Sequence, residues 1–90
     1  MRLVFHTNAW DDYLFWQVED RSILQDRSIL RKISELVRDI KRAPFTGLGK
    51  PEPLRFEFSG CWSRRIDQEH RLVYRVEGED IHILACRYHY

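Results

Sequence analysis

The chain has 90 residues, of which 43% are hydrophobic and 32% charged, and chains of this size form a single domain around one core. Fifteen basic and fourteen acidic residues give a formal net charge of +1. That balance excludes a strongly basic nucleic-acid-binding arm and an acidic disordered tail, so we expect one folded domain over residues 1–90.

The first residues contain one short apolar stretch, at 3–5, which predicts a strand over residues 2–6. It is too short for a signal peptide or a membrane span, so we expect a cytoplasmic protein without a membrane partner. Two cysteines, Cys61 and Cys86, are too few for a disulfide scaffold and lack metal-ligand spacing. We therefore expect reduced, structural thiols.

Two helices are predicted after this strand. Asn8 is a good N-cap for a helix that begins at Ala9, with Asp11 and Asp12 in its first turn. Its expected inner face consists of Trp10, Tyr13, Leu14 and Val18. A second helix is predicted over residues 28–42, ending before Pro44. Its apolar stripe consists of Ile29, Leu30, Ile33, Leu36, Val37 and Ile40.

A short internal repeat lies between the helices. The sequence Asp-Arg-Ser-Ile-Leu occurs at residues 20–24 and again at 26–30. Because six residues turn a helix by about 120° away from the starting face, both copies cannot face the core from one straight helix. We infer that one copy belongs to the second helix and that the other lengthens the connection.

The rest of the chain has the pattern of a loop followed by strands. Residues 45–53 contain two glycines and two prolines, which is typical of a loop. The predicted strands are residues 54–58, 61–66, 70–77 and 81–89. Short turns between them indicate an antiparallel meander. The sequence thus predicts an α+β fold of order β-α-α-β-β-β-β, with both helices on one face of a mainly antiparallel sheet of about five strands.

Two arginines of adjacent predicted strands, Arg65 and Arg71, are expected to lie close together. Neighbouring guanidinium groups repel unless carboxylates neutralise them or an anion lies between them. Two interpretations remain open from the residues alone: surface ion pairs with Asp67, Glu69 or Glu52, or a phosphate site.

If the arginines form a phosphate site, Glu52 and His89 could supply the acid and base of a catalytic reaction there. A carboxylate base, a histidine acid and arginines are the set that would cleave RNA through its own 2′-hydroxyl, without a metal or other cofactor. The same arginines would equally suit a protein that binds RNA or the ribosome without cutting.

Five blocks of this sequence closely resemble the YoeB toxins, the YoeB/Txe branch of the RelE superfamily. They are WDDYLFWQ at 10–17, GKPEPL at 49–54, SGCWSRRI at 59–66, EHRLVY at 69–74 and ACRYHY at 85–90. The resemblance implies a RelE-like, microbial-RNase-like fold. It also implies a toxin of a type II toxin-antitoxin system, a ribosome-dependent endoribonuclease that cleaves mRNA in the ribosomal A site and stops translation.

The resemblance also implies partners. These are a YefM-type antitoxin that wraps the toxin and displaces its catalytic end, the 70S ribosome with mRNA, and operator DNA only through the antitoxin complex. Whether the free toxin is a monomer or a homodimer stays open.

Residue roles follow from the resemblance by position. Glu52 is expected to be the general base and His89 the general acid, with Arg65 and Arg71 stabilising the phosphate. Substrate placement is expected from Lys50, Arg55 and Tyr90.

Three departures from the family pattern are visible. The duplication lengthens the helical region by six residues. Cys61 stands where an aromatic residue is expected, and residues 56–58 are more apolar and acidic than usual.

The small net charge conceals a polarised chain. Residues 1–20 carry one basic and four acidic side chains, whereas residues 31–76 carry eleven basic and six acidic ones. We therefore expect an Arg-rich face built from the second helix, the loop and the central strands, suited to a nucleic-acid partner.

Overall fold

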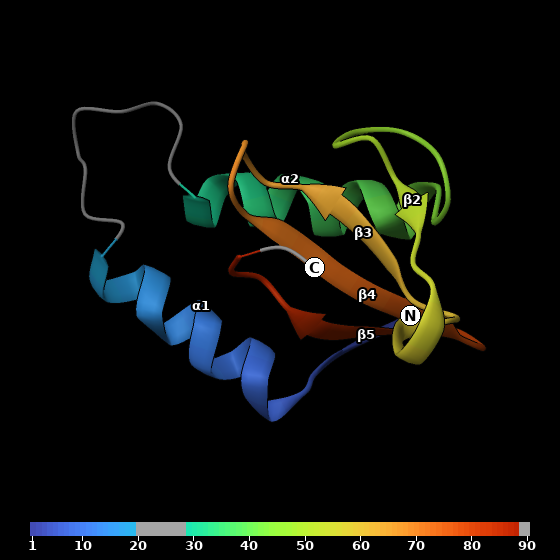
Figure 1. Ribbon diagram of the computed structural model, residues 1–90, viewed down its shortest axis with the longest axis horizontal. Coiled ribbons are helices and arrows are strands. Elements are labelled where there is room, and N and C mark those ends of the chain that lie inside the picture. Colours follow the sequence, from blue (N-terminus) through green and yellow to red (C-terminus); the bar gives the residue numbers. More distant parts are fainter. Residues whose placement is uncertain (20–28, 89–90) are drawn as a thin grey trace.

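The computed structural model describes residues 1–19 and 29–88 and shows an α+β fold, as the sequence predicts (Figure 1). The elements are β1 (Arg2–Phe5), α1 (Thr7–Glu19), α2 (Ile29–Arg42), β2 (Glu52–Pro53), the 3-10 helix η1 (Phe56–Phe58), β3 (Trp62–Arg65), β4 (Arg71–Glu77) and β5 (Asp80–Ala85). The first copy of the repeat, and most of the second, lie outside the described residues.

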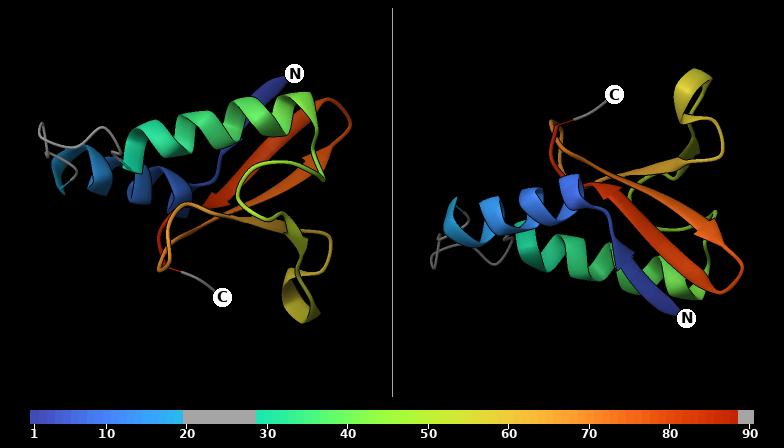
Figure 2. Two further views of the ribbon diagram at one scale, coloured as in Figure 1. Left: turned by 90° about the horizontal axis from the view of Figure 1, so that it is seen from above. Right: turned by 90° about the horizontal axis from the view of Figure 1, so that it is seen from below.

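The strands form one sheet of five, in the order β1-β5-β4-β3-β2. β1 runs parallel to β5, and the other neighbours are antiparallel, so the mainly antiparallel sheet is confirmed. β1 and β2 form its two edges, and both helices pack on the same face (Figure 2).

Two predicted strands are wrong in part. The strand expected over residues 54–58 is replaced by β2, two residues long, and by η1. Pro51 and Pro53 have no backbone N–H to donate to the hydrogen bonds that a longer strand would need. Phe56 has a left-handed φ of 58°, which a strand does not allow. The strand expected over 81–89 ends at Ala85 within the described residues.

The prediction for α2 is confirmed and that for α1 is corrected. Ile33, Leu36, Val37 and Ile40 of α2 are buried. Helix α1 begins at Thr7, so Asn8 lies inside it and Asp11 and Asp12 follow its first turn. Its buried residues are Ala9 and Trp16, whereas Trp10, Leu14 and Val18 are exposed and Tyr13 is half-buried. Small Ala9 permits close approach to the sheet, and Trp10 instead stacks on Tyr13 beside Phe5.

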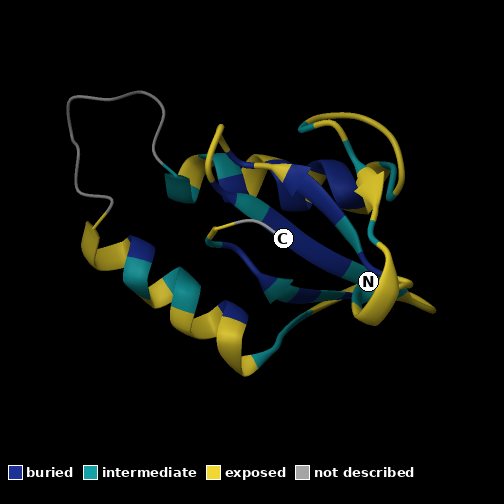
Figure 3. Ribbon diagram, in the orientation of Figure 1, coloured by how far each residue is buried: buried dark blue, intermediate teal, exposed yellow. Residues whose placement is uncertain are grey.

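Two hydrophobic clusters lie on opposite faces of the sheet. The larger one joins both helices to the strands, and three consecutive residues of β4, Leu72, Val73 and Tyr74, are buried (Figure 3). The smaller one consists of Cys61, Val73 and Ala85, with Leu54, Phe58 and Leu84 packed against it. This second face, which we call the open face, therefore has an apolar floor partly covered by the β2–η1 segment.

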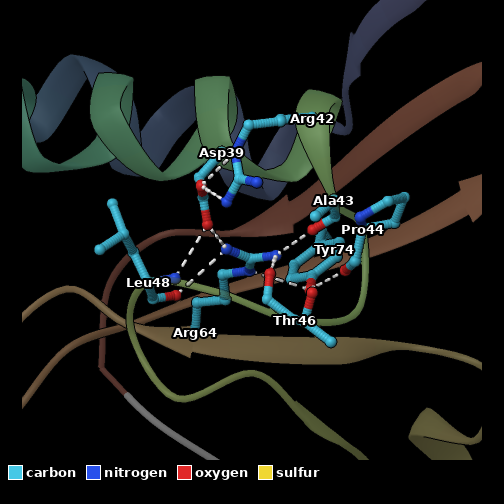
Figure 4. A network of polar contacts seen from close by, with 8 residues as sticks. All are labelled: Asp39, Arg42, Ala43, Pro44, Thr46, Leu48, Arg64 and Tyr74. Carbon is cyan, nitrogen blue, oxygen red and sulfur yellow. Dashed lines mark hydrogen bonds and ion pairs between the residues drawn. The ribbon is translucent and has the colours of Figure 1, made fainter.

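Arg64 anchors the loop that leads to β2. Its side chain is fully buried, and its guanidinium donates to Asp39 Oδ2 at 2.6 Å, to the Tyr74 hydroxyl at 3.1 Å and to three loop carbonyls (Figure 4). Those carbonyls belong to Ala43, Thr46 and Leu48. All five N–H groups of an arginine are thereby used.

Asp39 completes this network. It also accepts hydrogen bonds from Arg42 at 2.6 Å and from the Leu48 N–H at 2.8 Å. The hydrogen bonds from Arg42, from the Leu48 backbone and from Arg64 hold the pKa of Asp39 well below its usual range. Gly47 has a φ of 116°, and a Cβ there would overlap the Asp39 carboxylate, so the loop requires glycine at this point.

Both cysteines are buried and neither is in a disulfide bond. No helix in the described ranges 1–19 and 29–88 is long and apolar enough to cross a membrane.

Candidate functional site

Strand register brings three of the expected site residues to the open face. Arg65 pairs directly with Arg71 across β3 and β4, and Glu52 of β2 pairs with Ser63 of β3. Directly paired residues share a face, as do residues two apart in a strand. Glu52, Arg65 and Arg71 therefore lie on one face, with the Cβ atoms of the two arginines about 5 Å apart.

The expected ion-pair partners do not neutralise the two arginines. Asp67 closes the β3–β4 turn instead, because its Oδ1 accepts the N–H groups of Glu69 and His70 at 2.8 and 2.7 Å. Within residues 1–19 and 29–88, no ion pair joins Arg65 or Arg71 to a carboxylate. In this part of the chain the surface ion-pair interpretation therefore finds no ion pair at either arginine.

The Arg71 side chain is oriented by the turn that precedes it. Its Nη1 donates to the Asp67 and His70 carbonyls at 2.8 and 3.1 Å. Among the described residues, no hydrogen bond occupies the remaining N–H groups of this guanidinium.

A tight turn at Gly49 and Lys50 leads into β2, which carries Glu52. Gly49 and Lys50 have φ values of 79° and 52°, and the Arg65 N–H donates to the Gly49 carbonyl at 2.6 Å. A Cβ on Gly49 would lie 2.9 Å from Leu36 and 3.0 Å from the Arg65 carbonyl. Left-handed backbone at a residue other than glycine is typical of functional sites, and Lys50 is one of the residues expected to place the substrate.

Arg55 lies at the start of η1, exposed and without a side-chain capping bond. The following residue, Phe56, is 85% exposed. A cationic and an aromatic side chain thus stand side by side next to the open face, a combination suited to nucleobases.

His89 and Tyr90 lie outside the described residues, so their predicted roles as acid and substrate-placing residue stay predictions. The segment before them, residues 86–88, is hydrogen-bonded to α1 and to Arg71 of β4. Cys86 bonds to α1, with its N–H donating to Asp12 Oδ2 at 3.0 Å and its carbonyl accepting from Trp16 Nε1 at 2.8 Å. The Arg71 N–H donates to the Tyr88 carbonyl at 2.7 Å.

Several of these contacts are not predicted by the sequence pattern. The pattern places His70 in a predicted strand and Asp12 at the start of a predicted helix, and it indicates no bond from either residue to the end of the chain. The one available signal was the clustering of polar and aromatic residues at both ends of the chain. In the described part of the chain, no group of three or more His, Cys, Asp and Glu side chains could hold a metal ion.

Comparisons with known proteins show the family and the fold. The family model described as "YoeB-like toxin of bacterial type II toxin-antitoxin system" matches residues 5–90. Toxin YoeB of Escherichia coli K12 is 52% identical over 90 residues, covering 100% of both chains. The solved structure of the YoeB/ParE toxin from Agrobacterium tumefaciens has a TM-score of 0.87, with 50% identity and full coverage of both chains.

Other solved structures show assemblies and the fold. A YoeB dimer and a heterotetrameric YoeB–YefM complex from Staphylococcus aureus have TM-scores of 0.86 and 0.85. Each is 40% identical and matches 100% of this chain and 98% of the other. YafQ of E. coli, at 13% identity and a TM-score of 0.76, shows the shared fold alone.

Proposed function

The chain belongs to the family of YoeB-like toxins of bacterial type II toxin-antitoxin systems, and from this premise we propose that it is a ribosome-dependent mRNA endoribonuclease. It acts in the cytoplasm as one domain, residues 1–90. It cleaves mRNA in the ribosomal A site and thereby inhibits translation. The membership confirms the resemblance read from the sequence; the cleavage is our proposal.

The observation that carries the proposal is the Arg65–Arg71 pair. Two guanidinium groups directly opposite each other destabilise a sheet because their positive charges repel. Among the described residues, no carboxylate forms an ion pair with either of them. A backbone phosphate between them, with its single negative charge, would offset their repulsion through bidentate hydrogen bonds. Glu52 on the same face adds a base beside that phosphate.

The proposed reaction is a transesterification that itself cleaves the RNA chain. Glu52 takes the proton from the 2′-hydroxyl, and the 2′-oxygen forms a bond to the adjacent phosphorus. Arg65 and Arg71 stabilise the negative charge that accumulates on the phosphorane oxygens. The bond from phosphorus to the 5′-oxygen breaks, and His89 donates a proton to that oxygen. The products are a 2′,3′-cyclic phosphate and a 5′-hydroxyl.

The proposed partners follow the family. The S. aureus YoeB–YefM complex and YoeB dimer support a YefM-type antitoxin and a homodimer for this toxin as well. The ribosome and its mRNA are the proposed substrate, and operator DNA is reached only through the antitoxin complex.

Expression without antitoxin tests the proposal. The wild-type toxin should arrest growth and produce new mRNA 5′ ends, whereas Glu52→Gln should do neither. Glu57→Gln, an exposed glutamate on η1, is the matched control and should behave as the wild type. Arrest with intact transcripts would instead identify a protein that binds the ribosome without cutting.

A further inference from the structure

The Tyr88 backbone is held at both of its polar groups by consecutive residues at the start of β4. Its N–H donates to His70 Nδ1 at 2.8 Å, and its carbonyl accepts from the Arg71 N–H at 2.7 Å. Tyr88 has a left-handed φ of 63°, a conformation that costs free energy in a residue with a Cβ. The two hydrogen bonds therefore hold the chain in a turn that it would not adopt by itself.

Contacts with residues other than Tyr88 also hold the His70 ring in place. The residue is 9% exposed, and its ring lies edge-on to Trp16 with 4.8 Å between centroids. Its Nε2 lies 3.6 Å from Glu69 Oε1. Because a backbone N–H can only donate, Nδ1 carries no proton, and the proton of the neutral ring is on Nε2.

Packing alone does not account for this hydrogen bond. Tyr88 is 53% exposed, so water could satisfy its N–H at little cost, and an apolar ring in place of His70 could fill the space beside Trp16. What the Nδ1 acceptor adds is a defined position for Tyr88 relative to Arg71, one of the two arginines of the proposed phosphate site.

We propose that His70 is a positioning residue, whose neutral imidazole fixes the point from which the chain continues to His89. The inference rests on the proposed function, in which His89 supplies the acid. His70 touches neither RNA nor the reacting atoms; it acts through the backbone of Tyr88. Loss of its acceptor should slow the chemical step and leave ribosome binding intact, because small misplacements of a catalytic group reduce rates by roughly tenfold to a hundredfold.

The test compares variants that differ in the acceptor. His70→Asn keeps an oxygen at the place of Nδ1, His70→Gln carries its amide near the place of Nε2, and His70→Leu has no acceptor. His82→Leu is the control, since His82 of β5 bonds His6, which lies between β1 and α1, at 3.0 Å. Single-turnover cleavage of mRNA on programmed ribosomes, ribosome affinity and the amide resonance of Tyr88 in a ¹H–¹⁵N spectrum are measured for each.

We expect His70→Leu and His70→Gln to cleave about tenfold or more slowly at unchanged ribosome affinity, with the Tyr88 amide proton shifted upfield. His70→Asn should retain the wild-type rate within about threefold, because its oxygen can replace the Nδ1 acceptor. Equal rates in all three variants, or an unshifted Tyr88 amide in both His70→Leu and His70→Gln, would overturn the proposal. If His70→Leu does not fold, the difference in cleavage rate between His70→Asn and His70→Gln tests the proposal without it. If the wild type does not cleave, the proposed function fails, and the Tyr88 resonance still decides whether His70 holds the chain.

Discussion

Arg65 and Arg71 face each other directly across β3 and β4, and in the described residues neither forms an ion pair with a carboxylate. Both lie on the open face, with Glu52 on the neighbouring strand of the same face. Such a pair costs stability in the absence of an anion. We interpret it as the place where the scissile phosphate binds.

The first prediction separates the geometry of the arginines from their charge. Arg65→Lys and Arg71→Lys keep a positive charge but lose the planar fork that binds two phosphate oxygens. Each should lower the single-turnover cleavage rate by about 10²-fold, as for other donors that stabilise transition-state charge. Arg2→Lys, at an exposed arginine paired with Asp80, should leave the rate unchanged. Equal rates for the two lysine variants and the wild type would argue against bidentate phosphate binding.

Arg64 provides a prediction about stability. Arg64→Met removes five hydrogen bonds, leaves three loop carbonyls without their donor and deprives Asp39 of a buried partner. Breaking a buried pair in this way costs about 3–5 kcal/mol, so the melting temperature should fall by about 10 °C or more. Arg42→Met removes the exposed partner of the same carboxylate and should cost much less. Calorimetry that finds the two variants equally stable would contradict the anchoring role of Arg64.

Asp39 makes the fold sensitive to acid. Its folded-state pKa is lowered by Arg42, the Leu48 N–H and Arg64, whereas an aspartate in the unfolded chain titrates near about 3.9. The unfolded chain therefore binds a proton in this range that the folded chain does not. The stabilisation is complete above about pH 5 and is lost as the pH falls through the range below about 4.

The Asp39→Asn variant isolates this effect. Urea unfolding followed by tryptophan fluorescence should show it less stable than the wild type at neutral pH, with the difference shrinking below about pH 4. Asp80→Asn, at the exposed pair with Arg2, should show a much smaller difference. A difference for Asp39→Asn that does not depend on pH would rule out this source of acid sensitivity.

The thiols should be inert in the folded protein. Burial, with a smaller contribution from the charge of Asp12, raises the pKa of Cys86 to about 12, and Cys61 is also buried. Because the thiolate is the reactive form, a thiol reagent at about pH 8 should label neither cysteine until the protein is unfolded in urea. Rapid labelling of Cys86 in the native protein would mean that the 86–88 segment opens readily from α1.

Much of the fold could be predicted from the sequence because it follows local periodicity. The stripe on α2 specified its buried face, and the short turns specified the antiparallel strands. The inner face of α1 could not be predicted in this way. That helix meets the sheet through Ala9 and Trp16, and periodicity does not show which of several apolar positions will lie against a neighbour.

The site was only partly predictable, for a similar reason. Alternation along the strands allowed Arg65 and Arg71 to be placed together. The partners of Arg64 are mostly backbone carbonyls, and those of Tyr88 are a ring nitrogen and a backbone N–H of distant residues. Carbonyls and N–H groups occur at nearly every position, so their pairing becomes visible only in the folded chain.

The chemical nature of the cleaved RNA ends distinguishes the proposed attack by the 2′-hydroxyl from hydrolysis by water. Purified toxin is added to ribosomes programmed with a defined mRNA, and the new ends within the A-site codon are characterised, with Glu52→Gln as the inactive control. The proposed mechanism yields a 2′,3′-cyclic phosphate on one fragment and a 5′-hydroxyl on the other. The 5′-hydroxyl end must be phosphorylated before it can be ligated. Ends that carry a 5′-phosphate and a 3′-hydroxyl, or equal cleavage by Glu52→Gln, would contradict the proposed mechanism.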